Sequence, residues 1–208
     1  MNLAKLFELQ RKLDEHIEKE HPRKPGEDRL AKKILALVVE LGELANEARF
    51  FKYWSYNQKP RTEELGECPL CKGTGDLGTV WAENCIECRG TGKVVVKNPL
   101  LEEYVDCLHF ILSIGLELGM PHQLLLGNAQ ENEMLDDDFI ALYGEVHTLY
   151  RAYKCQVDLN KKVVRVYYES VFEHFLTLGE RLGFTWEQIE EAYLQKNAEN
   201  HARQENGY

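Results

Sequence analysis

The sequence predicts an all-α protein, a helical bundle that carries a small inserted module. Apolar residues recur at helical spacing over most of the 208-residue chain, and 44% of its residues are hydrophobic, enough to form a core. The helical pattern stops between residues 60 and 97, where two cysteine pairs and several glycines gather. We therefore expect a helical core formed by residues 1–59 and 98–208, and an insertion over residues 60–97.

Two helices are predicted before the insertion. Leucines at helical spacing indicate the first, over residues 2–20. The loop HPRKPGED follows, and in it Glu27 or Asp28 is placed to cap a second helix over residues 29–52.

The chain returns to helical periodicity after the insertion. The segment KVVVKNP predicts a short strand and a turn, and a helix then begins at Pro99 and continues to about Leu118. Thr185 is the expected N-cap of the last helix, because TWEQ has the T-x-x-Q pattern of a capping box. The remaining helices are expected over residues 121–134, 137–155, 162–182 and 185–205.

Charge and targeting signals narrow the function classes. A net charge of −10 argues against a general nucleic-acid coat or a membrane-surface binder. Residues 1–20 are amphipathic and charged, without the apolar region of a signal peptide, and no run of about 18 apolar residues is present. We expect a cytoplasmic protein with no membrane partner and no nucleic-acid partner.

The insertion is predicted to bind a structural zinc ion. CPLCKGTG and CIECRGTG are the same phrase twice, each a C-x-x-C pair followed by G-x-G. Four thiolates complete a tetrahedral Zn²⁺ site and leave no open position for chemistry. The alternative is two redox-active dithiols, which lack their usual β-α context. The remaining cysteines, Cys107 and Cys155, are expected to be packed thiols. The zinc ligands would be Cys68, Cys71, Cys85 and Cys88.

Two acidic motifs lie on the helices that flank the insertion. ELGELANE places Glu40, Glu43 and Glu47 on one helical stripe, where like charges repel one another. Either this stripe faces water or a cation offsets the repulsion. Glu103 and Asp106 lie one turn apart in EEYVDCLHFILSIGL, a helix that is apolar nearly all round and is therefore expected to be buried. Buried carboxylates without partners become neutral or bind a cation.

We expect the two acidic pairs to face each other across the bundle and to bind a metal ion. Ligand sets made only of oxygen favour Mg²⁺, with Mn²⁺ as an alternative, over Zn²⁺. Glu102, one residue away, is expected to lie in solvent. His109 is expected in the core or in a pocket wall, with a place beside the metal ligands as the alternative. The ligands would be Glu40, Glu43, Glu103 and Asp106.

A polar stripe is predicted on the last helix. It carries two cations and several amide groups at one-turn spacing, a combination that suits phosphate oxygens. The alternative is a solvated terminal helix whose basic residues favour the helix dipole. The stripe consists of Tyr193, Lys196, Asn197, Asn200, Arg203 and Gln204.

These motifs together resemble the all-α nucleoside triphosphate pyrophosphatase superfamily, which includes MazG-like enzymes, and in detail its dimeric dUTPase branch. The segments that carry the resemblance are LFELQRKLD, ELGELANE with FFKYWS, EEYVDCLHF and YLQKNAENHARQENGY. The insertion departs from the compact members of the family, because it separates the two acidic pairs more widely.

The resemblance implies an all-α homodimer that hydrolyses dUTP, and also dUDP, to dUMP. The carboxylates would hold Mg²⁺ ions that bridge the phosphates, and Glu40 or Glu43 would activate the attacking water. Metal ions would also explain how a protein of net charge −10 binds a tetra-anion.

The resemblance further implies a substrate pocket. Gln10, Asp14 and Trp54 would surround the base, and Phe110 would pack on the deoxyribose and exclude a 2′-hydroxyl group. The phosphates would be held by Lys196, Asn200, Arg203 and Tyr208, with Lys52.

Two other functions remain open from the sequence. The first is hydrolysis of dCTP, or of several pyrimidine deoxynucleotides. The second is a zinc-ribbon adaptor or nucleic-acid-binding regulator, which would bind nucleic acid in a salt-dependent way and show no Mg²⁺-dependent turnover. This second alternative rests on the basic side chains of the insertion, which are Arg61, Lys72, Arg89, Lys93 and Lys97.

Overall fold

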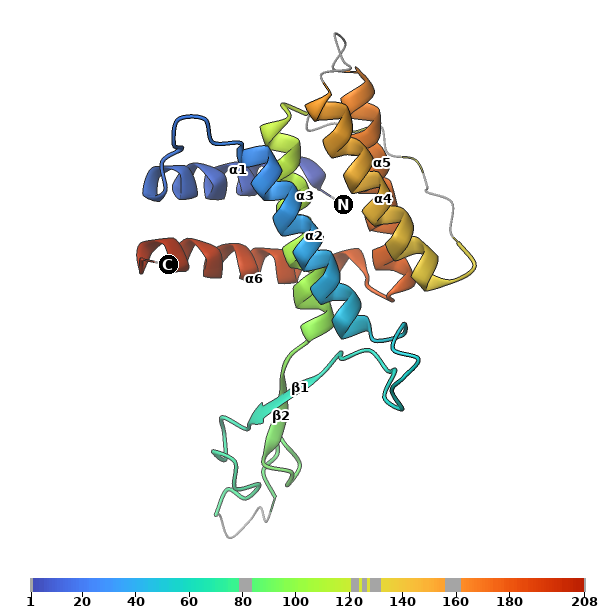
Figure 1. Cartoon of the computed structure of the whole chain (residues 1–208). Coiled ribbons are helices and arrows are strands. Elements are labelled where there is room, and N and C mark those ends of the chain that lie inside the picture. Colours follow the sequence, from blue (N-terminus) through green and yellow to red (C-terminus); the bar gives the residue numbers. More distant parts are fainter. Residues whose placement is uncertain are drawn as a thin grey trace.

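A computed structural model describes residues 2–78, 84–120, 124, 127, 132–155 and 162–207. In this part of the chain six helices surround the core and one two-stranded sheet lies outside it, so the all-α prediction is confirmed (Figure 1). None of these helices is long and apolar enough to cross a membrane. The elements are α1 (Leu3–Glu20), α2 (Arg29–Ala48), β1 (Glu64–Glu67), β2 (Lys93–Lys97), α3 (Pro99–Glu117), α4 (Leu135–Lys154), α5 (Lys162–Arg181) and α6 (Trp186–Glu205).

Side-chain caps define where the helices begin. Asp28 caps α2, and Asn98 caps α3 directly before Pro99, whose fixed φ suits the first turn of a helix. Thr185 and Gln188 form the predicted capping box at the start of α6. The expected caps at Asp28 and Thr185 are thus confirmed.

Three element predictions differ from the structure. α2 ends at Ala48 and not at residue 52, because Arg49 adopts a left-handed conformation with φ 64° that closes the helix. β1 was not expected, since its sequence ELGE is short and polar. α4 begins at Leu135, two residues early. Most of the helix predicted over residues 121–134 lies outside the described residues.

α3 is the central helix of the bundle. It packs along α2 and contacts α1, α5 and α6, and most of its residues are buried, as its apolar sequence predicts. α4 packs along α5 on one side of this centre, and α1 and α6 run side by side on the other (Figure 1). This arrangement brings the acidic residues of α2 and α3 together and encloses a space between α1, α2, α3 and α6.

Two buried tyrosines connect α3 to α5. Tyr104 of α3 donates its hydroxyl hydrogen bond to a carbonyl of α5 at 3.1 Å, and Tyr168 of α5 donates to a carbonyl of α3 at 3.0 Å. Each hydroxyl passes over a helical glycine, Gly179 and Gly115 respectively, where an added Cβ would collide with it. The two glycines therefore allow the close approach of these helices.

The insertion forms its own small module (Figure 1). β1 and β2 pair antiparallel, and the chain beyond them folds around the four cysteines, which form a hydrophobic cluster separate from the main core. Of the two remaining cysteines, Cys107 is buried as expected, but Cys155 is exposed at the end of α4. The prediction of a packed thiol at Cys155 is therefore wrong.

Candidate active site

Three of the four predicted Mg²⁺ ligands lie together between α2 and α3. Carboxylate oxygens of Glu40, Glu43 and Glu103 all lie within 4.8 Å of one another. Glu40 and Glu103 are half-buried, whereas Glu43 is exposed. Asp106 lies one turn beyond Glu103 and outside this group, and its Oδ2 atom is 2.6 Å from Nζ of Lys196.

The electrostatics of this carboxylate cluster favour a bound cation. Burial raises the pKa of Glu40 to about 7, and the charge of Asp106 adds to the shift. Burial and the neighbouring carboxylates also raise the pKa of Glu103 to about 7. A group of carboxylates that resists full ionisation fits a divalent cation, whose charge offsets both burial and repulsion.

Two further glutamates near the cluster pair with basic side chains. Glu47, the third member of the α2 stripe, forms an ion pair with Arg61 at 2.9 Å. Glu102 was expected in solvent but is half-buried. Its carboxylate forms ion pairs with Lys196 at 3.0 Å and with Lys97 at 3.5 Å, and these hold it against the protein. The expectation for Glu102 is corrected accordingly.

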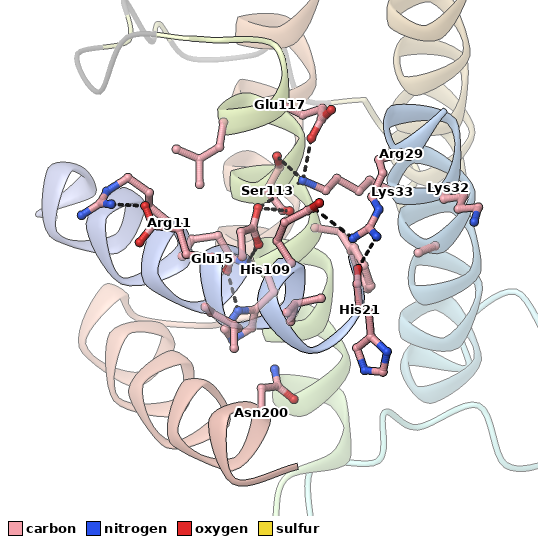
Figure 2. Close-up of a pocket in the computed structure, with 18 of the residues that line it drawn as sticks. Arg11, Glu15, His21, Arg29, Lys32, Lys33, His109, Ser113, Glu117 and Asn200 are labelled. Atoms are coloured by element: carbon pink, nitrogen blue, oxygen red, sulfur yellow. Dashed lines mark hydrogen bonds and ion pairs between the residues drawn. The ribbon is translucent and has the colours of Figure 1, made fainter. Parts of the chain in front are cut away.

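A cavity of about 770 Å³ adjoins the cluster and is lined by α1, α2, α3 and α6 (Figure 2). Its volume is within the range of nucleotide-sized ligand pockets. Glu40 and Asp106 line it and so connect it to the carboxylate cluster. The other predicted site residues in its wall are Gln10, Asp14, His109, Phe110, Asn200 and Arg203.

Three predicted substrate-binding residues that the structure describes are not in this wall. Lys52 bonds back to the end of α2, 3.1 Å from the carbonyl of Asn46, and Trp54 is 65% exposed in the loop that follows. Lys196 instead lines a second cavity, of about 570 Å³, between β2, α3 and α6. Tyr208 lies outside the described residues.

Gln10 organises the inner end of the larger cavity. Its Oε1 atom lies 2.9 Å from the Tyr193 hydroxyl and 2.8 Å from Nδ1 of His109, and its Nε2 donates to Asp14 at 2.7 Å. Because Oε1 can only accept, His109 carries its proton on Nδ1 and presents a lone pair on Nε2. Burial lowers the pKa of His109 to about 3, so the ring is neutral. The expectation of a pocket-wall histidine is confirmed.

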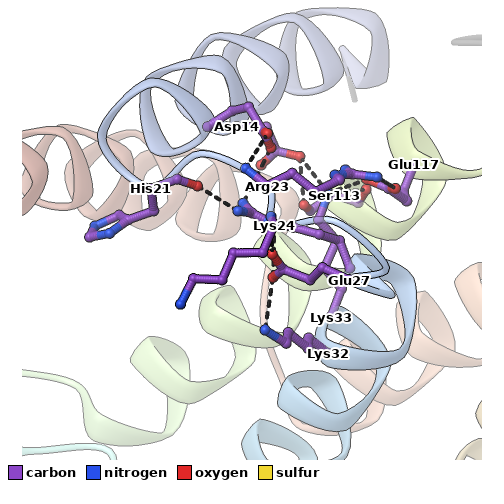
Figure 3. A network of polar contacts seen from close by, with 11 residues as sticks. Asp14, His21, Arg23, Lys24, Glu27, Lys32, Lys33, Ser113 and Glu117 are labelled. Atoms are coloured by element: carbon purple, nitrogen blue, oxygen red, sulfur yellow. Dashed lines mark hydrogen bonds and ion pairs between the residues drawn. The ribbon is translucent and has the colours of Figure 1, made fainter.

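The same chain of contacts extends to the rim of the cavity (Figure 3). Asp14 accepts hydrogen bonds from Ser113 at 2.6 Å and from Lys33 at 3.1 Å. Lys33 also reaches Glu117 at 3.1 Å, and Arg23 pairs with Glu117 at 2.9 Å. No local sequence pattern predicts this network, because its members come from separate elements that only the fold brings together.

Several buried polar atoms around the cavity have no hydrogen-bond partner within the described part of the chain. They include Nε2 of His109 and Oε1 of Gln204. His109 and Gln204 line the cavity. Native proteins rarely leave such atoms unpaired, so these positions are suited to a polar ligand.

The four cysteines of the insertion meet the geometry of a zinc site. They are buried, and the Sγ atoms of Cys68 and Cys85 are 3.7 Å apart, as are those of Cys71 and Cys88. Two thiolates bound to one Zn²⁺ at about 2.3 Å in a tetrahedron stand about 3.8 Å apart. In each knuckle a glycine N–H also donates to a thiol at 3.2 Å, which stabilises a thiolate.

The helical bundle, the acidic residues on two facing helices and the adjoining cavity fit the all-α nucleoside triphosphate pyrophosphatases that the sequence motifs resemble. A family model described as dUTPase matches residues 2–67 and 91–208, which is most of the chain. The chain therefore belongs to the all-α dUTPase family, whose members are dUTP diphosphatases. The match omits residues 68–90, which contain all four cysteines of the knuckles. A comparison with curated proteins finds no match.

Proposed function

We propose that this dUTPase hydrolyses dUTP to dUMP and pyrophosphate with Mg²⁺, or alternatively Mn²⁺, held by the carboxylates of α2 and α3. The observation that carries the proposal is the convergence of Glu40, Glu43 and Glu103 within 4.8 Å beside a nucleotide-sized cavity. Asp106 would be the fourth ligand. When bound, the metal would neutralise the triphosphate and lower the pKa of a coordinated water.

Glu40 is the better candidate to orient and deprotonate the attacking water. Both Glu40 and Glu43 belong to the carboxylate cluster, but only Glu40 also lines the cavity. A proton acceptor must lie within hydrogen-bond reach of the water that it activates, so access to the cavity decides between them.

The phosphates would lie toward α6. Asn200 and Arg203 line the cavity and offer an amide and a guanidinium group at one-turn spacing, which fits phosphate oxygens. Lys196 follows the same face of α6 and adjoins Asp106. Neither Lys52 nor Trp54 lines the cavity of about 770 Å³. Their proposed roles therefore require the loop after α2 to move toward this cavity.

The inner end of the cavity favours uracil over cytosine. The neutral His109 ring lines the cavity and offers an acceptor on Nε2. Uracil carries an N–H donor beside carbonyl acceptors, whereas cytosine has an acceptor at the equivalent ring nitrogen. Pairing two acceptors at a buried position costs about 1–3 kcal/mol, so we expect dUTP to be preferred over dCTP by about tenfold or more.

A homodimer is the proposed assembly. Two aliphatic side chains of α2, Leu35 and Val39, are 64% and 50% exposed beside the carboxylate cluster, and a second copy could cover them. Light scattering of the purified protein at micromolar concentration should give twice the chain mass of 24.2 kDa. A monomeric mass would contradict the dimer.

One experiment tests the proposed activity and its base preference. Pyrophosphate release is measured from dUTP, dCTP, dTTP and UTP, and phosphate release from dUDP, each with and without Mg²⁺. The proposal predicts Mg²⁺-dependent release that is fastest with dUTP, and cleavage of dUDP between the α and β phosphates. Equal rates for dUTP and dCTP would refute the role of His109, and turnover without a divalent cation would refute the metal site.

A further inference from the structure

Lys196 is a cation held inside the acidic site by two carboxylates. Its side chain is only 10% exposed, and its Nζ atom lies 2.6 Å from Asp106 and 3.0 Å from Glu102. Glu102 has a second partner, Lys97 at the end of β2, at 3.5 Å. The ammonium group thus lies where α3 and α6 meet, beside the cluster of Glu40, Glu43 and Glu103.

The ammonium group and a divalent cation compete for the same carboxylate. Asp106 gives its Oδ2 atom to Lys196, so full coordination of a metal ion by Asp106 requires Lys196 to withdraw. Even if the metal ion took only the other oxygen, a positive charge a few ångströms away would repel it, and partial burial strengthens that repulsion. Lys196 therefore weakens metal binding in the free protein.

We propose that Lys196 is a positioning residue that makes metal binding depend on nucleotide. In the free enzyme its ammonium group neutralises Asp106. When substrate and metal bind together, the ammonium group leaves Asp106 and pairs with the triphosphate. This inference rests on the metal site proposed above. Glu102 keeps its ion pair with Lys196 after Asp106 turns to the metal, so the lysine remains next to the site.

The position of Lys196 on α6 makes this transfer possible. Asn200 and Arg203 lie four and seven residues further along, on the same helical face, and both line the nucleotide-sized cavity. An ammonium group released from Asp106 can then join these side chains at the phosphates. By linkage, a nucleotide that removes Lys196 from Asp106 must raise the metal affinity, and the metal must raise the nucleotide affinity equally.

The test measures Mn²⁺ binding to zinc-loaded, nucleotide-free protein by the electron paramagnetic resonance signal of free Mn²⁺. Lys196→Met should bind Mn²⁺ about tenfold more tightly than the wild type, because a nearby positive charge is gone. Lys196→Arg should bind as weakly as the wild type. If Lys196→Met does not fold, Lys196→Gln replaces it with the same expectation. Lys97→Met is the matched control, because it removes an exposed charge from the same Glu102 and should change the affinity by less than about twofold.

A second arm adds the non-hydrolysable analogue α,β-imido-dUTP. It should tighten Mn²⁺ binding in the wild type by a larger factor than in Lys196→Met. The proposal is overturned if Lys196→Met binds Mn²⁺ no more tightly than the wild type, or if Lys97→Met has the same effect. Mn²⁺ binding to the wild type that is absent even with the analogue, or that is unchanged by Glu103→Gln, would instead contradict the metal site on which the proposal rests.

Discussion

Single side chains in this protein determine where their neighbours carry protons. Gln10 directs its carbonyl to His109 and Tyr193 and its amide to Asp14, and this orientation fixes which nitrogen of the histidine carries the proton. In the acidic cluster, burial and the neighbouring carboxylates raise the pKa of Glu40, so its ionisation depends on what binds there. The proposed roles of both places rest on the unpartnered Nε2 of His109 within the described residues and on the raised pKa of Glu40.

Glu40→Gln should stabilise the metal-free protein at pH 8 while it abolishes turnover. The pKa of Glu40 is raised to about 7 from 4.5, so the folded state binds the proton more tightly than the unfolded chain. Its contribution to stability is full below pH 4.5 and is lost as the pH rises through 7. Allowing for solvent screening of this half-exposed group, the variant should gain about 1 kcal/mol in urea unfolding at pH 8 and less at pH 5. Equal stability of both proteins at the two pH values would contradict this account.

At the scale of elements, the site depends on close packing around α3. The helix presents Glu103 and Asp106 toward α2 and α6, while Tyr104 on its other side anchors it to α5. Glycines at the crossing points let the tyrosine hydroxyls reach backbone carbonyls. The position of the carboxylates is thus maintained from the opposite side of the same helix.

Gly179→Ala should destabilise the fold by about 2 kcal/mol or more, because the new methyl group collides with the Tyr104 hydroxyl in a packed core. Gly144→Ala on α4 is the control. Apart from its chain neighbours and the backbone of its own helical turns, no atom of the described residues lies within 4 Å of the added methyl group there, so this change should be neutral or stabilise by up to about 1 kcal/mol. Chemical denaturation of both variants measures the difference, and equal losses would show that the helix crossing is not tight.

The four-cysteine insertion is a second element with its own small core. Metal analysis should find one Zn²⁺ per chain in the wild type and none in Cys85→Ser. Because its cysteine cluster is separate from the main hydrophobic core, zinc removal should unfold the module and leave most of the helical circular dichroism intact. Loss of all helical signal on chelation would show instead that the bundle requires the module, and no change in melting temperature would contradict a structural role.

At the scale of the whole molecule, the sequence predicts the features that depend on local patterns, such as helices and motifs. It does not predict contacts between residues that are far apart in the chain. Helices follow from leucine spacing and caps such as Asp28, and the two acidic motifs are local enough to predict that α2 and α3 meet. The ion pair between Asp106 and Lys196 joins residues far apart in the chain, so no local pattern reports it. The exposed Trp54 is another such case, because a motif says nothing about which way a loop turns.

The measurement that tests the central claim most directly is the Mg²⁺ dependence of dUTP hydrolysis in Glu103→Gln, with Glu47→Gln as the control. Glu103 belongs to the carboxylate cluster, whereas Glu47 lies on the α2 stripe but pairs with Arg61. Removing a metal ligand should lower kcat/KM by at least about 100-fold, with partial recovery at high Mg²⁺. Glu47→Gln should retain activity within about fivefold of the wild type. Equal losses in both variants, or wild-type activity in Glu103→Gln, would contradict the proposed carboxylate metal site.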